Sequence, residues 1–239
     1  MTTAGIIILL AYFIRGITGF GSGLIAVPLL AHILPLQMAV PLILITDFSA
    51  SVAMSRVQRG NVAWNEIRPL LPFGLIGVIL GVTLLIHVPQ KPLMTTLSFI
   101  IILFALRNML NLGGQHPISR AWAGPAGLAG GTIGALFGTG GPPYVVYLTH
   151  RISDKSQLRA TFSGLFMIDG GVRIIVFTLS GLLLHVQLLW AIALAVPLMA
   201  LGLFLGNRVH VGLSSRQMHL LVGLLLFGSG ISLLWKSAS

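Results

Sequence analysis

The sequence contains no cysteine, only four acidic residues and few charged residues of any kind. Without cysteine, neither a disulfide nor a thiolate metal site can form, and the redox compartment leaves no trace in the sequence. Charged residues make up 8% of the chain, whereas an ordinary soluble domain is about a quarter charged. So little charge cannot cover a molecule with a wetted surface, and this excludes an ordinary soluble enzyme.

The apolar residues occur in long blocks separated by short charged breaks. Of the 239 residues, 56% are hydrophobic, and the mean hydropathy is +0.99. A helix that spans a bilayer needs roughly 20 apolar residues, and several blocks have this length. The apolar segments are 4–34, 36–56, 66–88, 92–112, 121–149, 157–181, 186–207 and 216–235. The sequence therefore predicts an all-α polytopic membrane protein.

The net charge of +10 does not indicate nucleic-acid binding. The basic residues are scattered among short loops and do not gather on one polar face. Basic loops of this kind set the orientation of a membrane protein, because they stay on the cytoplasmic side. We therefore expect the lipid bilayer as a partner and no nucleic acid.

The two halves of the chain carry the same features in the same order, which indicates an internal repeat. The matched features are a Phe-Gly-Ser/Thr-Gly motif, an aspartate inside an apolar segment, a Pro-Gly-Gly pattern and a basic residue. They are Phe20–Gly23 and Phe137–Gly140; Asp47 and Asp169; Pro72, Gly77, Gly81 and Pro197, Gly202, Gly206; and Lys91 and Arg216. Four matches in one order predict a duplication, with a first repeat at 1–115 and a second at 116–239.

The segments 4–34 and 121–149 are longer than a spanning helix needs, and glycines interrupt each near its middle. Each is either a long tilted helix that crosses the membrane or a re-entrant hairpin. Apart from Arg15 and Arg173, which lie well within apolar segments, the chain has 12 Lys and Arg residues, and these divide six against six if all eight segments cross. If these two segments instead enter and return to the same side, the division is ten against two. The second division fits the positive-inside tendency. We therefore predict two inverted repeats, each a re-entrant helical hairpin plus three transmembrane helices.

This topology places the protein in the plasma membrane, which is the inner membrane in bacteria. Both termini and Lys91 are predicted to lie outside. The basic stretches 56–68, 107–120 and 151–159 are predicted to face the cytoplasm.

The glycine tips of the two hairpins are the candidate substrate site. A helix is expected to start after each tip, with Ser22 and Thr139 as N-caps and Pro142 in a first turn. Two helix N-termini that face one cavity favour an anion, although glycines can also serve only to pack helices closely. The predicted substrate-binding residues are Arg15, Gly19, Phe20, Gly21, Ser22, Gly23, Phe137, Gly138, Thr139, Gly140, Gly141 and Pro142.

Four charged residues are expected at membrane depth, where each is costly. Arg15 lies one turn before the first tip, so it can assist an anion or pair with Asp47. Asp47 and Asp169 are candidates for proton coupling, because a desolvated carboxylate can titrate near neutral pH; each can instead cap a broken helix. Asp169 and Arg173 are four apart on one helix and can form a structural ion pair.

The sequence shows no pattern for catalysis, a metal or a cofactor. The histidines have no ligand spacing, no Gly-Lys-Ser/Thr follows the glycines, and no hydrolase motif occurs. We expect no enzyme activity, no metal and no cofactor.

Phe20-Gly-Ser-Gly and Phe137-Gly-Thr-Gly-Gly-Pro-Pro, in a duplicated membrane protein of this size, resemble the sulfite exporter TauE/SafE family. The resemblance extends along nearly the whole chain and is most specific over 134–147. It implies transport of small sulfur-containing anions such as sulfite, thiosulfate or organosulfonates. It assigns no role to Arg15 or Arg173, whose roles depend on the residue-level argument.

The sequence thus predicts a secondary transporter that binds a small inorganic or organosulfur anion at the midplane and works by alternating access. An anion channel and a membrane scaffold that transports nothing are the alternatives. The specific anion, the direction of transport, the coupling ion and the presence of a homo-oligomer stay open.

Overall fold

The computed structural model describes residues 2–18, 21–57, 62–110, 118–138, 141–209 and 215–238, and within them every regular element is a helix. The first half contains α1 (Thr2–Thr18), α2 (Ser22–Leu30), α3 (Leu36–Val57), α4 (Trp64–Ile67), α5 (Leu71–His87) and α6 (Gln90–Met109). The second half contains the 3₁₀ helix η1 (Arg120–Trp122), α7 (Ala123–Phe137), α8 (Gly141–Arg151), α9 (Lys155–Leu179), α10 (Val186–Val209) and α11 (Ser215–Ala238). The predicted all-α class is confirmed for this part of the chain.

Both unusually long apolar segments are broken where the sequence places glycines. The first divides into α1 and α2, and the second into α7 and α8. Gly21 precedes α2 with φ of 94°, and Gly138 follows α7 with φ of 67°. Residues with a Cβ rarely adopt these left-handed conformations, so glycine allows the chain to turn at both places.

The remaining segments match the predicted helices within a few residues, with one division. Segment 66–88 separates into the short α4 and the longer α5, joined by a turn. Pro72 lies in the first turn of α5, where its missing N–H removes no helical hydrogen bond. Glu66 therefore belongs to a short helix outside the apolar one.

Several described helices have the length and composition to cross a membrane. Four contain a sufficiently long apolar window, at Leu36–Ala53, Gln90–Arg107, Ser156–Leu179 and Val186–Arg208. Two shorter apolar helices, Thr3–Ile17 and Leu71–His87, accompany them.

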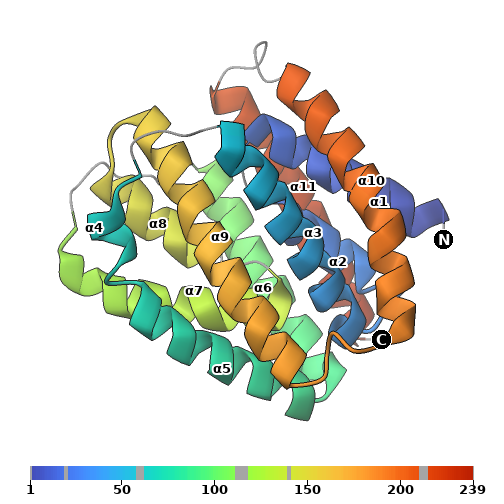
Figure 1. Cartoon of the computed structure of the whole chain (residues 1–239). Coiled ribbons are helices and arrows are strands. Elements are labelled where there is room, and N and C mark those ends of the chain that lie inside the picture. Colours follow the sequence, from blue (N-terminus) through green and yellow to red (C-terminus); the bar gives the residue numbers. More distant parts are fainter. Residues whose placement is uncertain are drawn as a thin grey trace.

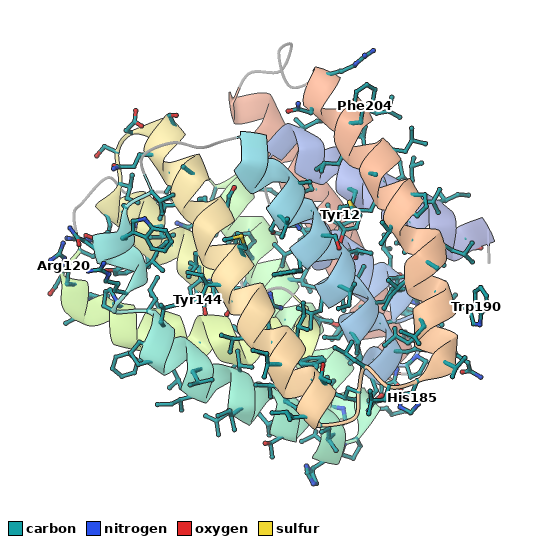
Figure 2. All side chains as sticks on the ribbon, in the orientation of Figure 1. Tyr12, Arg120, Tyr144, His185, Trp190 and Phe204 are labelled. Carbon is teal, nitrogen blue, oxygen red and sulfur yellow. The ribbon has the colours of Figure 1, made fainter. Side chains whose placement is uncertain are left out.

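The outer surface of the bundle is apolar, as a bilayer requires. Trp190 of α10 is 70% exposed, and Phe204 projects from the same helix. Figure 2 shows both side chains pointing away from the bundle, whereas Tyr12 and Tyr144 lie inside it. Large apolar side chains on α5 and α6 are also exposed. A soluble protein rarely presents so much continuous apolar surface, so these faces are suited to lipid.

Helices of the two halves pack in an exchanged pattern (Figure 1). α5 of the first half packs along α7, while α10 of the second half packs along α1. The repeated glycines lie in these contacts: a Cβ at Gly81 would be 2.6 Å from the carbonyl oxygen of Thr132, and one at Gly202 would be 2.5 Å from that of Leu9. Real Cβ atoms essentially never approach so closely, so the glycines are needed for backbone contact.

α3 and α9, one from each half, also pack against each other and cross the front of the bundle in Figure 1. Asp47 lies near the middle of α3, and Asp169 near the middle of α9. The two aspartates matched in the sequence repeat are therefore held by one pair of packed helices.

The second broken segment begins and ends at the same end of the molecule. Arg151, the last residue of α8, donates from Nη1 to the carbonyl oxygen of Ile118 at 3.0 Å. Ile118 lies just before η1 and α7. The α7–α8 unit therefore runs into the bundle and returns.

Candidate functional site

A small cavity lies between the two glycine turns and the packed helices α3 and α9. Its volume is about 30 Å³, which suits one or two water molecules, because one buried water needs roughly 10–15 Å³. The described residues that line it are Arg15, Gly21, Gly23, Asp47, Phe48, Ser51, Gly138, Gly141, Phe166, Gly170 and Arg173. Both halves contribute, and a polyatomic solute can enter only if the surrounding side chains separate.

Arg15 holds a network on the first-half side of the cavity. Its Nη1 lies 2.6 Å from Asp47 Oδ1 and donates to Ser22 Oγ at 3.1 Å. Its Nη2 donates to Ser51 Oγ at 2.7 Å. Arg15 is only 4% exposed, and its buried Nε has no hydrogen-bond partner among the described residues. The guanidinium thus retains one unused donor beside the cavity.

Three donors converge on a single carboxylate oxygen of Asp47. Besides Arg15, Ser22 Oγ donates to Oδ1 at 2.6 Å, and the Tyr12 hydroxyl lies 2.5 Å from the same atom. The Tyr12 hydroxyl is also 2.6 Å from Thr46 Oγ1. Its single proton can serve one acceptor, and the ionised carboxylate is the stronger of the two. One oxygen of Asp47 on α3 is therefore bonded to both α1 and α2.

Arg173 is the basic residue that the second half contributes to the described lining of the cavity. Its Nε lies 2.9 Å from Asp169 Oδ2, and its Nη1 donates to the carbonyl oxygen of Gly134 at 2.8 Å. The Nε–H is not aligned with the carboxylate for a hydrogen bond, so charge attraction joins this pair. The Tyr144 hydroxyl donates to Asp169 Oδ1 at 3.0 Å. Arg173 and Asp169 are both buried.

The glycine turns bring helix N-termini to the same cavity. Gly21 and Gly23 line it at the start of α2, and Gly141, the first residue of α8, lines it from the other half. No heavy atom lies within 4 Å of a Cβ built on Gly21, whereas one on Gly138 would be 3.1 Å from Val27 Cγ2. Backbone N–H groups at helix starts carry partial positive charge, which adds to that of the two arginines.

The structure brings together seven of the predicted residues at the cavity and separates others from it. Those at the cavity are Arg15, Gly21, Gly23, Gly138, Gly141, Asp47 and Arg173. Ser22 bonds to this group from a buried position, and Asp169 lines a neighbouring pocket with Tyr144. Phe137 and Pro142 are buried but are not among the lining residues. Gly19, Phe20, Thr139 and Gly140 lie outside the described residues.

The prediction that Ser22 is an N-cap was wrong. Gly21 occupies the cap position without a side-chain bond, and Ser22 is the first helical residue. Its hydroxyl donates to Asp47 instead, because that carboxylate is a stronger acceptor than a neutral group would be. The prediction that Pro142 lies in a first helical turn is confirmed, since α8 starts at Gly141.

Sequence reasoning missed several residues of the site. Phe48, Ser51, Phe166 and Gly170 line the cavity, and Tyr12 and Tyr144 bond to the two aspartates. Ser51 is one helical turn after Asp47, which is the same offset that separates Arg173 from Asp169. That shared spacing is the signal that could have identified Ser51.

A second charged cluster lies where α4, η1 and the end of α8 meet. Arg151 binds Glu66 through two bonds, Nε to Oε2 at 3.0 Å and Nη2 to Oε1 at 2.8 Å. Tyr147 donates to Oε2 at 2.8 Å, and Arg120 approaches Oε1 at 3.2 Å. The pKa of Glu66 is lowered from 4.5 to about 2, chiefly by the hydrogen bonds from Arg151. This cluster joins the two halves with a carboxylate that stays ionised.

An apolar helical bundle with paired charges around a central cavity is typical of a multi-pass membrane protein with a functional site between its helices. The model of the sulfite exporter TauE/SafE family matches residues 4–233, and the chain belongs to this family. It is also similar to the probable inner membrane transporter protein TsaS of Comamonas testosteroni. The identity is 26% over 204 residues, which cover 82% of this chain and 83% of that protein. No solved structure matches the chain.

The chain is therefore a multi-pass membrane protein of the sulfite exporter TauE/SafE family. The predicted family resemblance is thereby confirmed.

Proposed function

We propose that this protein is a secondary transporter of a small anion, a sulfur oxyanion or organosulfonate such as sulfite, across the inner membrane. The observation that carries the proposal is that two buried arginines, one from each half, face a single cavity between glycine turns. Charged residues at the centre of an apolar bundle are costly even when they are paired, and such residues often mark the path of a substrate.

We infer that the anion lies between Arg15 and Arg173, in the small cavity once the side chains around it separate. The unused Nε–H of Arg15 supplies a donor, and the N-terminal ends of α2 and α8 supply backbone N–H groups. Ser51 lies at the same wall, where its hydroxyl donates to the carbonyl oxygen of Asp47 at 2.8 Å and accepts from Arg15. The glycines of the turns leave the backbone open to a ligand, because no side chain covers it.

The two halves act as inverted repeats in this proposal. The exchanged packing of α1 with α10 and of α7 with α5 is what a two-fold relation between halves produces. The hydrogen bond between Arg151 and Ile118 supports a re-entrant α7–α8 hairpin. The tips of two hairpins entering from opposite faces then meet at the cavity, and relative movement of the halves opens it alternately to each side.

Asp47 is the better of the two candidates for proton coupling. It lines the cavity, and its side chain is 18% exposed, whereas that of Asp169 is 4% exposed. Asp169 contacts Arg173 on its own helix and lines a separate pocket. A proton from the cavity therefore reaches Asp47 more readily, and Asp169 serves as the structural partner of Arg173.

A ligand screen tests the proposed function. Purified protein is heated with sulfite, sulfate, thiosulfate, taurine, sulfoacetate or acetate, and the unfolding temperature is measured. A ligand at 100 times its Kd stabilises by about 2.7 kcal/mol, which is a readily measured shift. Arg173→Gln is expected to abolish the shift, whereas Arg208→Gln, which removes an arginine stacked on Phe204 at the outer surface, is expected to retain it.

Uptake into liposomes separates the transporter from its alternatives. Saturable uptake and exchange of internal for external anion are expected of alternating access. Uptake without exchange indicates a channel. Absence of both ligand stabilisation and uptake contradicts the proposal and favours a scaffold.

A further inference from the structure

The charged groups around the cavity balance each other. Arg15 pairs with Asp47, and Arg173 pairs with Asp169. With all four groups ionised, the described residues of the site carry two positive and two negative charges. The empty site is therefore electrically neutral.

Among the described residues, the charged side chains around Asp47 and the cavity are those of Arg15, Asp169 and Arg173. α1 contributes Arg15 and Tyr12, and α9 contributes Asp169 and Arg173 from its central turns. α2 and α7 contain no charged residue, and α5 contains only His87 at its far end. Arg208 of α10 stacks on Phe204 at the outer surface. The balance at the cavity thus depends on the two arginines and two aspartates.

A monovalent anion that enters this neutral site leaves one uncompensated negative charge at membrane depth, which is costly. One proton taken up at the same time restores neutrality. Asp47 is the acceptor that the geometry favours, because its carboxylate and the anion compete for the same guanidinium of Arg15. When Asp47 is protonated, its attraction for Arg15 falls, and Arg15 is released to the anion.

We propose, on the basis of the proposed function, that each anion crosses with one proton carried on Asp47, so that transport of a monovalent anion is electroneutral. The proton comes from the solvent on the loading side and leaves to the solvent on the other side with the anion. Ser22 and Tyr12 remain beside the protonated carboxyl as hydrogen-bond partners. Asp169 stays ionised and keeps the charge of Arg173 balanced.

Steady-state accumulation in liposomes tests the stoichiometry. The probes are methanesulfonate, which has one fixed negative charge, and thiosulfate, which has two. A potential of 100 mV changes the equilibrium ratio of internal to external concentration about 50-fold for each net charge carried. A gradient of one pH unit changes the same ratio about tenfold when one proton is coupled to each anion. The protein is reconstituted at its full length, and potential and pH gradient are imposed separately.

For methanesulfonate, we expect about tenfold accumulation for one pH unit and no response to the potential. For thiosulfate, we expect the same tenfold response to pH together with about 50-fold exclusion by 100 mV, negative inside. Either probe alone decides the stoichiometry. Transport of either with no pH-driven accumulation overturns this inference and leaves the proposed function standing. Uptake of neither probe, nor of any anion in the ligand screen, overturns both.

Two variants assign the proton to Asp47. Asp47→Asn is expected to lose pH-driven accumulation and to keep exchange of anion for anion. Asp154→Asn, which changes a carboxylate that caps α9 far from the cavity, is expected to behave as the unchanged protein does. If accumulation driven by the pH gradient persists in folded Asp47→Asn protein, Asp47 does not carry the proton. If that variant does not fold, the measurement on the unchanged protein still decides the stoichiometry.

Discussion

Arg151 and Ile118 lie at opposite ends of the α7–α8 unit in sequence, yet a 3.0 Å hydrogen bond joins them in space. The residues before α7 and after α8 are therefore neighbours. We therefore expect both to lie on one face of the bilayer.

Cysteine labelling tests that consequence, because the chain contains no cysteine of its own. Ser119→Cys and Ser153→Cys are expected to react with an impermeant maleimide from the same side. Gln187→Cys, in the exposed start of α10, is expected to react from the other side. Ser119 and Ser153 labelled from opposite sides would show that the α7–α8 segment crosses the membrane.

The glycine turns yield a prediction that separates backbone conformation from packing. Gly21→Ala is expected to cost about 1–3 kcal/mol of stability through its left-handed φ, although a Cβ there meets nothing within 4 Å. Transport is expected to fall further than the amount of folded protein. Gly228→Ala is the matched control: its Cβ also meets nothing, and its backbone is helical. We expect that control to be neutral or slightly stabilising. Equal effects of the two changes would contradict the role of the turn.

The buried pair on α9 predicts a rescue. Asp169→Asn leaves Arg173 without its counter-ion in the bundle interior, and breaking such a pair typically costs about 3–5 kcal/mol. The double change Asp169→Asn with Arg173→Gln is expected to recover much of that loss, as measured by thermal unfolding in detergent. Asp169→Asn protein as stable as the unchanged protein would show that the pair is not structural.

The Glu66 cluster predicts a dependence of stability on pH. The folded-state pKa of Glu66 is about 2, below its ordinary value of 4.5, so the folded protein binds fewer protons at this group. The contribution of ionised Glu66 to the free energy of unfolding is complete above pH 4.5 and is lost as the pH falls towards 2. It amounts to at most about 3 kcal/mol, and less in practice because Arg120 is 60% exposed.

Glu66→Gln is therefore expected to lower the unfolding temperature at pH 7 and to make little difference near pH 2. The measurement is a thermal melt at several pH values. A constant difference between the two proteins across this range would show that the charge of Glu66 is not the cause.

The breaks in the long segments were predictable because they depend on local chemistry. A glycine run inside an apolar segment interrupts a helix whatever its neighbours are, and both breaks occur at the expected residues. Helix boundaries followed from apolar length for the same reason. The sequence left open whether Arg15 pairs with Asp47 or assists an anion. The pairing depends on how α1 and α3 are rotated about their axes, which no local pattern determines.

The remainder of the site depends on tertiary packing. Phe48 and Gly170 meet because α3 and α9 pack there, where a Cβ on Gly170 would lie 3.1 Å from Phe48 Cδ2. No local pattern marks either residue. Ser22 was expected to cap a helix, as serine commonly does. Its hydroxyl instead donates to the carboxylate of Asp47 on another helix.

The exchanged packing of the halves also determines the order in which the chain can be completed during synthesis. α5 is made before its partner α7, and α6 is the one long helix between them, so this contact can form before the rest of the second half is made. α1 is made before the other described helices, yet its partner α10 begins only at Val186. The glycine-lined face between them must stay uncovered, or be shielded by the insertion machinery, until most of the chain has been translated. The packing of α1 is therefore completed late in translation, and a chain that stops before α10 leaves α1 without its partner.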